Sequence, residues 1–310
     1  MEKNAKIYVA GHTGLVGSAI VRKLRSEGYT NLVLRTHSEL DLTDQAQTLT
    51  FFQTERPEYV IDAAALVGGI QANNAAPADF FYINMQIENN LLWSAHLCEV
   101  RKFLFLGSAC MYPKSCHQPM QEELLLTGLP EVTNEAYALA KVCGSRLCSY
   151  LRRQYGDDFI SAIPANTYGP GDSFDPEHAH VIPSLLVKYH RARERGDEAV
   201  SLWGTGVAMR EFIHVDDLAD ACLFLMNHYS GDEPINIGTG EEISILALSQ
   251  MIRNIVAFPG SIECDPTRPD GMLRRVVDSS RLAAMGWKPS VSLEDGLREM
   301  YAGYVSGLTT

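Results

Sequence analysis

The sequence predicts an α/β fold, in which a parallel β-sheet carries helices on both faces and a smaller, irregular C-terminal part follows. From residue 7 to residue 164, short apolar runs alternate with longer stretches of helical period, which is typical of parallel strands joined by crossover helices. After Asn166 this rhythm breaks down, and scattered prolines separate short segments. The 310 residues, of which 46% are apolar and 21% charged, have the composition of a globular protein and exclude disordered, collagen-like and coiled-coil chains.

Each expected strand is an apolar run too short for a helix, and each expected helix is a longer periodic stretch. The strands are expected at 7–10, 32–34, 59–64, 103–106 and 159–164. The helices between and after them are expected at 15–24, 44–55, 79–98 and 134–155. A helix at 216–227 and a strand at 234–237 are expected to return to this sheet. We therefore expect one domain over 1–165, with returning segments near 212–240, and a second domain over 166–310.

Charge and cysteine content exclude several classes of partner and site. The 38 acidic and 26 basic residues give a net charge of −12, which repels a phosphate backbone, so nucleic acid is not expected as a partner. No apolar stretch approaches the roughly 18 residues that span a bilayer, and no signal-peptide pattern precedes the first strand, so we expect a cytoplasmic protein without a membrane partner. The seven cysteines form no C-x-x-C pair, so neither a disulfide framework nor a metal site is predicted.

A glycine-rich turn follows the first expected strand. Gly11, Gly14 and Gly17 have the spacing G-x-x-G-x-x-G and lead into a helix. Glycine at such a turn lets a pyrophosphate approach the backbone, and the helix N-terminus presents amide hydrogens to the anion. The turn therefore predicts a dinucleotide site in a Rossmann-type, doubly wound sheet, although close packing of a helix on a sheet would make similar demands.

The end of the second strand bears on which dinucleotide binds. The segment from Leu34 to His37 has no acidic residue directly at the strand tip to hold a ribose 2′-hydroxyl. Arg35 and His37 are suited instead to a 2′-phosphate, which favours NADP over NAD.

Three further residues predict acid–base chemistry. Tyr137 and Lys141 are i,i+4 neighbours on one face of an expected helix, where the cation should lower the pKa of the phenol and make proton transfer feasible near neutrality. A solvated surface helix is the alternative for this common spacing. Ser108 favours the catalytic interpretation, because it follows the carboxyl end of an apolar strand, where open α/β sheets bind ligands.

Ser108, Tyr137 and Lys141 together resemble the Ser-Tyr-Lys triad of the short-chain dehydrogenase/reductase superfamily, and the glycine spacing is similar to that of its extended branch, which acts on nucleotide sugars. Within that branch, the chain from about residue 6 to about residue 301 is similar to the GDP-L-fucose synthases. The segments that carry this similarity are Ala63-Ala-Ala-Leu-Val-Gly-Gly-Ile70, Asn73-Asn74, Pro77-Ala-Asp-Phe80, Gly107-Ser-Ala-Cys-Met-Tyr-Pro-Lys114, Asn166-Thr-Tyr-Gly-Pro170, His180-Val-Ile-Pro183, Trp203-Gly-Thr-Gly206 and Arg210-Glu-Phe-Ile-His-Val-Asp-Asp217.

The resemblance implies an NADPH-dependent enzyme that epimerises GDP-4-keto-6-deoxy-D-mannose at C3 and C5 and then reduces the C4 ketone. In that chemistry Cys110 corresponds to the base and His180 to the acid, since thiol and imidazole exchange protons near neutrality. Tyr137 corresponds to the proton donor for the C4 oxygen, which Ser108 hydrogen-bonds as its charge develops. Without the resemblance, Cys110 would be interpreted as a buried apolar thiol and His180 as a locally bonded helix-end residue.

The resemblance also implies two sets of binding residues. The NADP(H) set is Gly11, Thr13, Gly14, Leu15, Val16, Gly17, Arg35, His37, Asp41, Leu42, Leu106, Gly107, Lys141, Pro164, Asn166, Thr167 and His180. The set for the GDP-sugar is Asn166, Val181, Lys188, Trp203, Arg210 and Asp270, close to a basic pair at Arg274 and Arg275. A core aromatic is the alternative for Trp203, and a solvated helix charge is the alternative for Lys188.

Departures from the family pattern leave alternatives open. Thr13 and His37 stand where many members have arginine, which leaves the choice between NADPH and NADH open. Apolar residues replace polar ones at Leu66, Ala109, Ala165 and Ala179. These changes fit drift, or a related GDP-4-keto sugar such as a 3,6-dideoxy or 6-deoxy-heptose derivative. A GDP-sugar 4-reductase without epimerase activity, and a nicotinamide-sensing module without catalysis, are the further alternatives; Cys110 with His180 argues against the first, and the Tyr/Lys pair against the second.

Two expected helices carry apolar residues around more of their circumference than a surface helix needs. These residues are Leu91, Leu92, Trp93 and Leu97 in 88–100, and Leu139, Val142, Leu147 and Leu151 in 138–151. Because extended family members pair these helices with their copies in a four-helix interface, the resemblance implies a homodimer.

Overall fold

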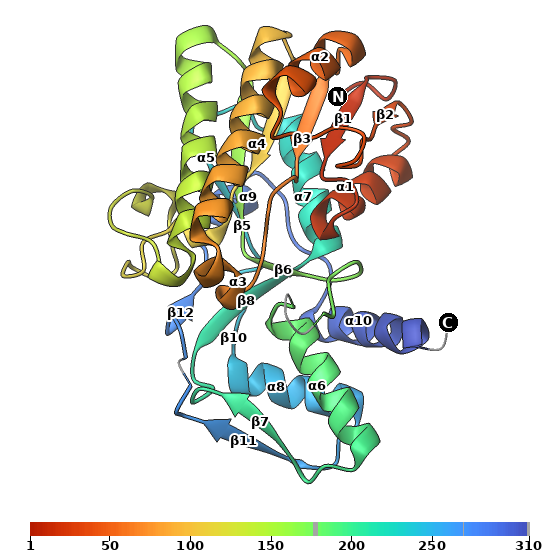
Figure 1. Ribbon diagram of the computed structural model, residues 1–310, viewed down its shortest axis with the longest axis vertical. Helices are drawn as coiled ribbons and strands as arrows, with labels where there is room; N and C mark the ends of the chain where they lie inside the picture. The colour runs from red at the N-terminus through yellow and green to blue at the C-terminus, as the bar shows by residue number, and fades with distance from the viewer. Residues whose placement is uncertain (176–178, 269, 309–310) are drawn as a thin grey trace.

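A computed structural model describes residues 1–175, 179–268 and 270–308. In Figure 1 a helix-covered sheet forms the upper part of the molecule, and smaller sheets with α6, α8 and α10 form the lower part. The upper sheet has six strands in the order β2-β1-β3-β4-β5-β9, all paired in parallel. They are β1 (Ile7–Ala10), β2 (Leu32–Val33), β3 (Tyr59–Asp62), β4 (Lys102–Leu106), β5 (Phe159–Pro164) and β9 (Ile235–Ile237). The predicted Rossmann-type sheet is thus confirmed.

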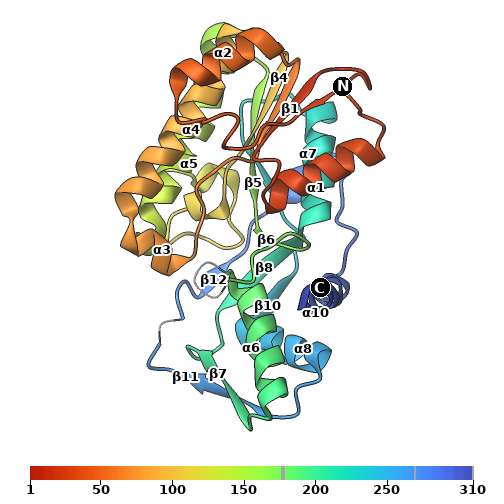
Figure 2. The same ribbon diagram turned by 45° about the vertical axis from the view of Figure 1, so that its right-hand side comes forward.

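Helices cover both faces of this sheet, as its apolar strands require. One face carries α1 (Leu15–Ser26) and α7 (Val215–His228), and the other carries α2 (Gln45–Glu55), α4 (Pro77–Leu97) and α5 (Glu135–Tyr155) (Figures 1 and 2). Each face has its own apolar core, which includes Ile20 and Leu104 on the first face and Phe103 and Leu91 on the second. The short helix α3 (Ile70–Ala75) precedes α4.

The expected elements of this sheet and its covering helices are all present, and their ends differ by at most two residues from the expected ones. Local hydrogen bonds explain two of the differences. β3 ends at Asp62, two residues early, because its Oδ1 accepts the N–H of Ala64 at 2.9 Å and turns the chain. α4 begins two residues early because Pro77 occupies its first turn, where a missing N–H costs nothing.

The C-terminal part is more regular than its prolines suggest. It contains β6 (Asn166–Tyr168), α6 (Val181–Arg195), β7 (Ala199–Trp203), β8 (Met209–His214), β10 (Glu242–Ser244), α8 (Ile245–Val256), β11 (Ser261–Asp265), β12 (Arg274–Arg275), α9 (Ser280–Ala284) and α10 (Leu293–Leu308). β10, β8 and β12 form one small sheet, β6 pairs with β8, and β11 pairs with β7. Tyr189, Leu248 and Ile252 belong to the core of this part, whereas Leu282 of α9 packs into the core of the large sheet.

Three short 3-10 helices lie between β4 and α5. They are η1 (Ala109–Met111), η2 (Glu122–Leu124) and η3 (Val132–Asn134). The sequence predicts no helix or strand between residues 106 and 134, and the chain there runs as a loop from the carboxyl end of β4 to the start of α5. These short turns fix the two ends of the connection, so that the residues after β4 and those before α5 meet.

A buried carboxylate joins β8 to two other segments. Glu211 is fully buried, and its Oε1 accepts the N–H groups of Thr239 at 2.7 Å and Gly240 at 2.8 Å. Its Oε2 accepts the N–H of Val277 at 2.9 Å. The Glu211 side chain therefore holds two segments against β8: the turn after β9 and the residues after β12.

Replacing Glu211 with alanine should leave three N–H groups without this acceptor, and that of Val277 is buried. We expect Glu211→Ala to lower the free energy of unfolding by about 3 kcal/mol, within the range for a broken buried network. Urea denaturation measures the loss. Glu263→Ala, which removes an exposed carboxylate from β11, is the matched control and should change stability by less than about 0.5 kcal/mol. Equal losses in the two variants would contradict this role of Glu211.

Candidate active site

The turn between β1 and α1 has the close backbone packing that a pyrophosphate site needs. Gly11 has a φ of +72°, and a Cβ atom there would lie 2.6 Å from the carbonyl oxygen of Ala63. A Cβ atom at Gly17 would lie 2.1 Å from the carbonyl oxygen of Gly11. Gly14 is the N-cap of α1 and, among the described residues, no side chain caps this end. The first-turn amides of α1 are therefore accessible to an anion.

Arg35 and His37, the two side chains predicted to bind a 2′-phosphate, follow β2. Neighbouring groups engage Arg35 more closely than His37. The Nη2 atom of Arg35 is 2.5 Å from Oε1 of Glu55, and its Nη1 donates to the carbonyl of Leu34 at 2.9 Å. His37 is exposed, with its Nδ1 4.0 Å from Oδ1 of Asp41. Arg35 would therefore share its charge between Glu55 and a phosphate, whereas His37 is open to solvent.

Tyr137 and Ser108 form the hydrogen-bonded part of the predicted triad. Ser108 caps η1 directly after β4, and its Oγ accepts the N–H of Cys110 at 3.3 Å. Tyr137, in the first turns of α5, is hydrogen-bonded to Ser108. Burial raises the pKa of Tyr137 to about 12, although the charge of Lys141 lowers it. Lys141 therefore lowers the pKa of the phenol, as expected, but desolvation outweighs the cation.

Lys141 itself is buried against α4. Its Nζ lies 3.0 Å from Oε1 of Glu88 and 4.7 Å from the ring centre of Phe105. Burial by itself lowers the pKa of Lys141, but the charges of Glu88, Tyr137 and Asp62 raise it above its ordinary value. Lys141 therefore stays charged. The sequence analysis did not predict Glu88, whose only signal is an acidic residue inside an apolar helix face.

Two donors converge on the sulfur of Cys110 in η1. Nδ2 of Asn134 lies 2.9 Å from Sγ, and Nη1 of Arg275 lies 3.5 Å from it. Asn134 precedes α5, three residues before Tyr137, and Arg275 comes from β12. Neither was assigned a role from the sequence, although Arg275 was noted as one of a basic pair. Their N–H groups suit a sulfur that carries negative charge.

His180 is the N-cap of α6 and has an acidic neighbour. Its Nδ1 is 3.6 Å from Oδ1 of Asp172, a side chain that is only 4% exposed. The neighbouring carboxylate of Asp172 raises the pKa of His180. Asp172 ends a Gly-Pro-Gly-Asp segment and has no role predicted from the sequence.

The residues predicted for the nucleotide end are mostly engaged within the chain. Trp203 ends β7 and is 54% exposed, with the guanidinium of Arg268 5.0 Å from its ring centre, so the alternative of a core aromatic is wrong. Arg210 donates to the carbonyl of Met272 at 2.7 Å, and burial, with the charge of Arg275, lowers its pKa to about 10.

Two more of these residues have partners near Trp203. Lys188 of α6 donates to the carbonyl of Ser201, and burial lowers its pKa. The carboxylate of Asp270 accepts the N–H of Thr205 at 2.7 Å and its hydroxyl at 2.8 Å. Asp270 therefore holds the glycine turn after Trp203 in place.

The other predicted residues lie near the carboxyl edge of the sheet or at the start of α6. They are Thr13, Leu15 and Val16 in the glycine turn, Asp41 and Leu42 after β2, Leu106 and Gly107 at the end of β4, Pro164 at the end of β5, Asn166 and Thr167 in β6, and Val181 in α6. Asn166 donates to the carbonyl of Glu211 at 2.8 Å, which ties β6 to β8. The sheet edge thus gathers segments that are far apart in sequence.

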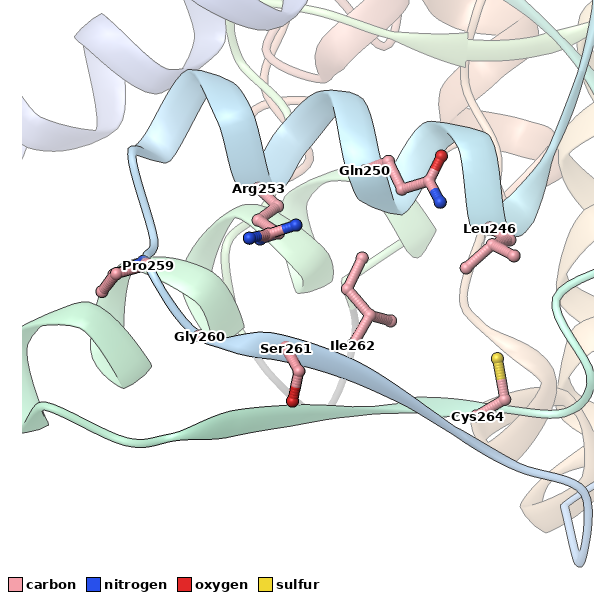
Figure 3. Close-up of a pocket in the computed structure, with 8 residues that line it drawn as sticks. All are labelled: Leu246, Gln250, Arg253, Pro259, Gly260, Ser261, Ile262 and Cys264. Carbon is pink, nitrogen blue, oxygen red and sulfur yellow. The ribbon is translucent and has the colours of Figure 1, made fainter.

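Two surface hollows are present. The first contains none of the predicted site residues, and the second contains only Lys188 of them. One, of about 480 Å³, lies between α8 and β11, and Figure 3 shows Gln250 and Arg253 of α8 facing Ile262 of β11 across it. The other, of about 250 Å³, is lined by Lys188, Arg191 and other residues of α6. Within the described parts of the chain, no cluster of three or more metal-ligating side chains is present. None of the described helices has the length and apolar character needed to cross a bilayer.

Comparison with known proteins finds a family and several enzymes to which this chain is similar. Residues 7–238 match the NAD-dependent epimerase/dehydratase family. GDP-L-fucose synthase 1 of Arabidopsis thaliana is 54% identical over 99% of this chain and 95% of its own length. The GDP-L-fucose synthase of Escherichia coli K12 is 46% identical over 97% of this chain and 96% of its own. A solved GDP-L-fucose synthetase of Naegleria fowleri bound to NADP superposes with a TM-score of 0.91 at 28% identity, and covers 100% of this chain and 97% of that one.

Removing the charge of Asp172 should change the titration of His180. In Asp172→Asn the carboxylate that raises the pKa of His180 is gone, so we expect that pKa to fall. NMR titration of histidine-labelled protein measures it, with the exposed His37 as an internal reference that should not move. An unchanged His180 titration would show that Asp172 does not control this imidazole.

Proposed function

The chain belongs to the NAD-dependent epimerase/dehydratase family and, within it, to the GDP-L-fucose synthases, and on this premise we propose how its residues convert GDP-4-keto-6-deoxy-D-mannose to GDP-L-fucose. The observation that best supports this activity is the 54% sequence identity to the Arabidopsis thaliana enzyme, over nearly the full length of both chains. The reaction is an epimerisation at C3 and C5 followed by an NADPH-dependent reduction at C4. The assignment of individual residues is our proposal, supported by the contacts of each side chain.

The glycine turn and the tip of β2 fit the cofactor. The tight approach of Gly17 to Gly11 leaves backbone exposed where a side chain would otherwise stand, and the uncapped start of α1 suits the pyrophosphate. His37 and the partly neutralised Arg35 would hold the 2′-phosphate. When bound, NADPH supplies a hydride to the C4 carbon.

Epimerisation needs a base and an acid beside the sugar ring. The C4 ketone acidifies the hydrogens on C3 and C5, and Cys110 would remove each as a thiolate, held by Asn134 and Arg275. His180 would return a proton to the opposite face of the resulting enolate, with Asp172 orienting the imidazole. The C–H electron pair moves onto the C4 oxygen and back again, so neither oxidant nor reductant is consumed.

Reduction needs a proton on the C4 oxygen as the hydride arrives at carbon. Tyr137 would donate it, because its raised pKa keeps the phenol protonated throughout the neutral range. Ser108, already hydrogen-bonded to the phenol, would stabilise the charge that develops on the same oxygen. Lys141 supplies the positive charge that partly offsets the phenolate left after transfer.

The exposed Trp203 ring, with Arg210 and Lys188 nearby in the C-terminal part, would receive the GDP end of the substrate.

Two of the departures from the family pattern do not favour a different sugar. Ala109 and Ala165 are both buried in the apolar core under the sheet, so the missing hydroxyls there change packing rather than a sugar contact. The 6-deoxy sugar therefore stays the preferred substrate.

We expect a homodimer formed through α4 and α5. Of the apolar residues in these helices, Leu91, Leu92, Val142 and Leu151 are core residues, Leu147 is partly buried, and Trp93, Leu97 and Leu139 are exposed. An exposed tryptophan and exposed leucines on two adjacent helices are the kind of residues that a second copy covers. Light scattering at micromolar concentration should give twice the chain mass of 34.3 kDa. A monomeric mass would exclude this interface.

Cys110→Ser should separate the two chemistries. With GDP-4-keto-6-deoxy-D-mannose and NADPH in D₂O, wild-type protein should place deuterium at C3 and C5, and the variant should nearly lose that incorporation because an alcohol is a far weaker base than a thiolate. Hydride transfer should survive and yield a 6-deoxy-D-mannose or 6-deoxy-D-talose product. Proton NMR of the product reports both. Cys98→Ser is the control, since that thiol is buried outside the site and the change should leave incorporation intact. Wild-type deuterium levels in Cys110→Ser would remove Cys110 from the mechanism.

A further inference from the structure

Asn134 is the N-cap of α5, but its side chain does not cap the helix. The side-chain oxygen of an N-cap asparagine ordinarily accepts an N–H of the first helical turn. Among the described residues, no such bond is present at the start of α5. The backbone fixes Asn134 instead, because its own N–H donates to the carbonyl of Glu131 at 3.0 Å. The side-chain amide therefore does not serve the start of the helix.

Only one end of this amide has a partner within the described parts of the chain. Nδ2 donates to Sγ of Cys110 at 2.9 Å. Oδ1 is buried and has no hydrogen-bond partner there. A buried carbonyl oxygen without a donor costs free energy, so such atoms in native proteins ordinarily bind water or a ligand. Oδ1 of Asn134 is thus an acceptor that a bound molecule can satisfy.

A second polar atom beside the same thiol is also unpartnered. Nη1 of Arg275 lies 3.5 Å from Sγ of Cys110, and Nη2 donates to Sδ of Met272 at 3.1 Å. Nε of Arg275 is buried, and no described residue accepts its hydrogen. Two residues that contact one sulfur thus hold an unused acceptor and an unused donor. This combination suits a ligand that carries both hydroxyl and carbonyl oxygens.

The chemistry of the substrate limits which donor can reach Oδ1 of Asn134, and this step rests on the proposed function. In that function Cys110 takes the protons of C3 and C5, and Ser108 with Tyr137 binds the oxygen of C4. Oδ1 and Nδ2 are attached to one carbon atom, so a group bound by Oδ1 lies close to the carbon that Cys110 deprotonates. C4 is a ketone and C5 carries a methyl group. Of these three carbons, C3 alone carries an O–H donor.

We propose that Asn134 binds the C3 hydroxyl of the sugar through Oδ1 while Nδ2 holds the sulfur of Cys110, which makes the enzyme specific for a sugar that carries this hydroxyl. The planar amide fixes both bonds in one geometry, so the hydroxyl that is recognised stands on a carbon that is deprotonated. A sugar without it would leave Oδ1 unpaired, and such unpaired groups are how a polar site rejects a deoxy analogue.

The test compares two substrates that differ only in this hydroxyl, GDP-4-keto-6-deoxy-D-mannose and its 3-deoxy form, each with NADPH. We expect the wild-type kcat/KM for the hydroxylated sugar to be about tenfold higher or more. In Asn134→Ala the two values should lie within about threefold, because only the hydroxylated sugar loses a partner. A folding defect would instead lower both values alike. Asn254→Ala, at an exposed asparagine of α8, is the matched control and should keep the wild-type preference.

Asn134→Asp separates the two ends of the amide. Its carboxylate keeps an oxygen for the hydroxyl, but it replaces the N–H donor with a negative charge beside the sulfur of Cys110. We therefore expect the preference for the hydroxylated sugar to remain. Deuterium entry from D₂O at C3 and C5 should slow by about tenfold or more, because a neighbouring negative charge disfavours a thiolate. Aspartate is also a good N-cap residue, so this variant should fold if Asn134→Ala does not.

Three results would overturn the proposal: wild-type protein without a preference for the hydroxylated sugar, Asn134→Ala with the wild-type preference, or Asn134→Asp without it. Where the 3-deoxy sugar is not turned over, calorimetric dissociation constants of the two sugars for the protein with NADP⁺ give the same comparison. Failure of the proposed function has a different signature, because wild-type protein would then turn over neither sugar with NADPH.

Discussion

Parallel pairing of the strands is the constraint on which the rest of this protein depends. Because β1, β3, β4 and β5 all run in one direction, their carboxyl ends meet at one edge of the sheet. The glycine turn follows β1, Asp62 ends β3, and Ser108 and Cys110 follow β4. The short turns of the loop after β4 then return the chain to that edge, where Tyr137 lies in the first turn of α5. A cofactor site and a proton-transfer site can therefore share one surface although their residues are scattered through the sequence.

Burial decides the protonation states at that edge more than charge pairing does. For Tyr137, Asp62 and Glu88, desolvation is the largest influence on the pKa and favours the neutral form. Lys141 is the exception, because the Glu88 carboxylate 3.0 Å away is the largest of the influences that outweigh its desolvation. The site thus combines a cation with a phenol that holds its proton near neutrality, which suits delivery of a proton to a substrate oxygen.

The sequence predicted those features that depend on neighbours close in the chain. The glycine turn and the Tyr137–Lys141 pair each lie within one local element, so spacing alone indicated them, and the resemblance added Cys110 and His180. Neither the spacing nor the resemblance predicted which side chains contact Cys110 and His180. Arg275 reaches Cys110 across 165 residues and Asn134 across 24, and no local pattern marks such a contact. For a related reason the sequence displays the lysine that lowers the pKa of Tyr137 but not the burial that raises it by more.

The two faces of α5 have consequences for how this protein can vary in evolution. One face of the helix carries Tyr137, Lys141 and Gly144, and exposed apolar residues such as Leu139 stand on another. Each residue added to a helix rotates everything beyond it by about 100°. A single insertion after Tyr137 would therefore turn Lys141 away from Glu88 and displace the outer surface at the same time. Length changes among related chains are expected to avoid this helix and to gather in loops such as the one that joins β4 to α5.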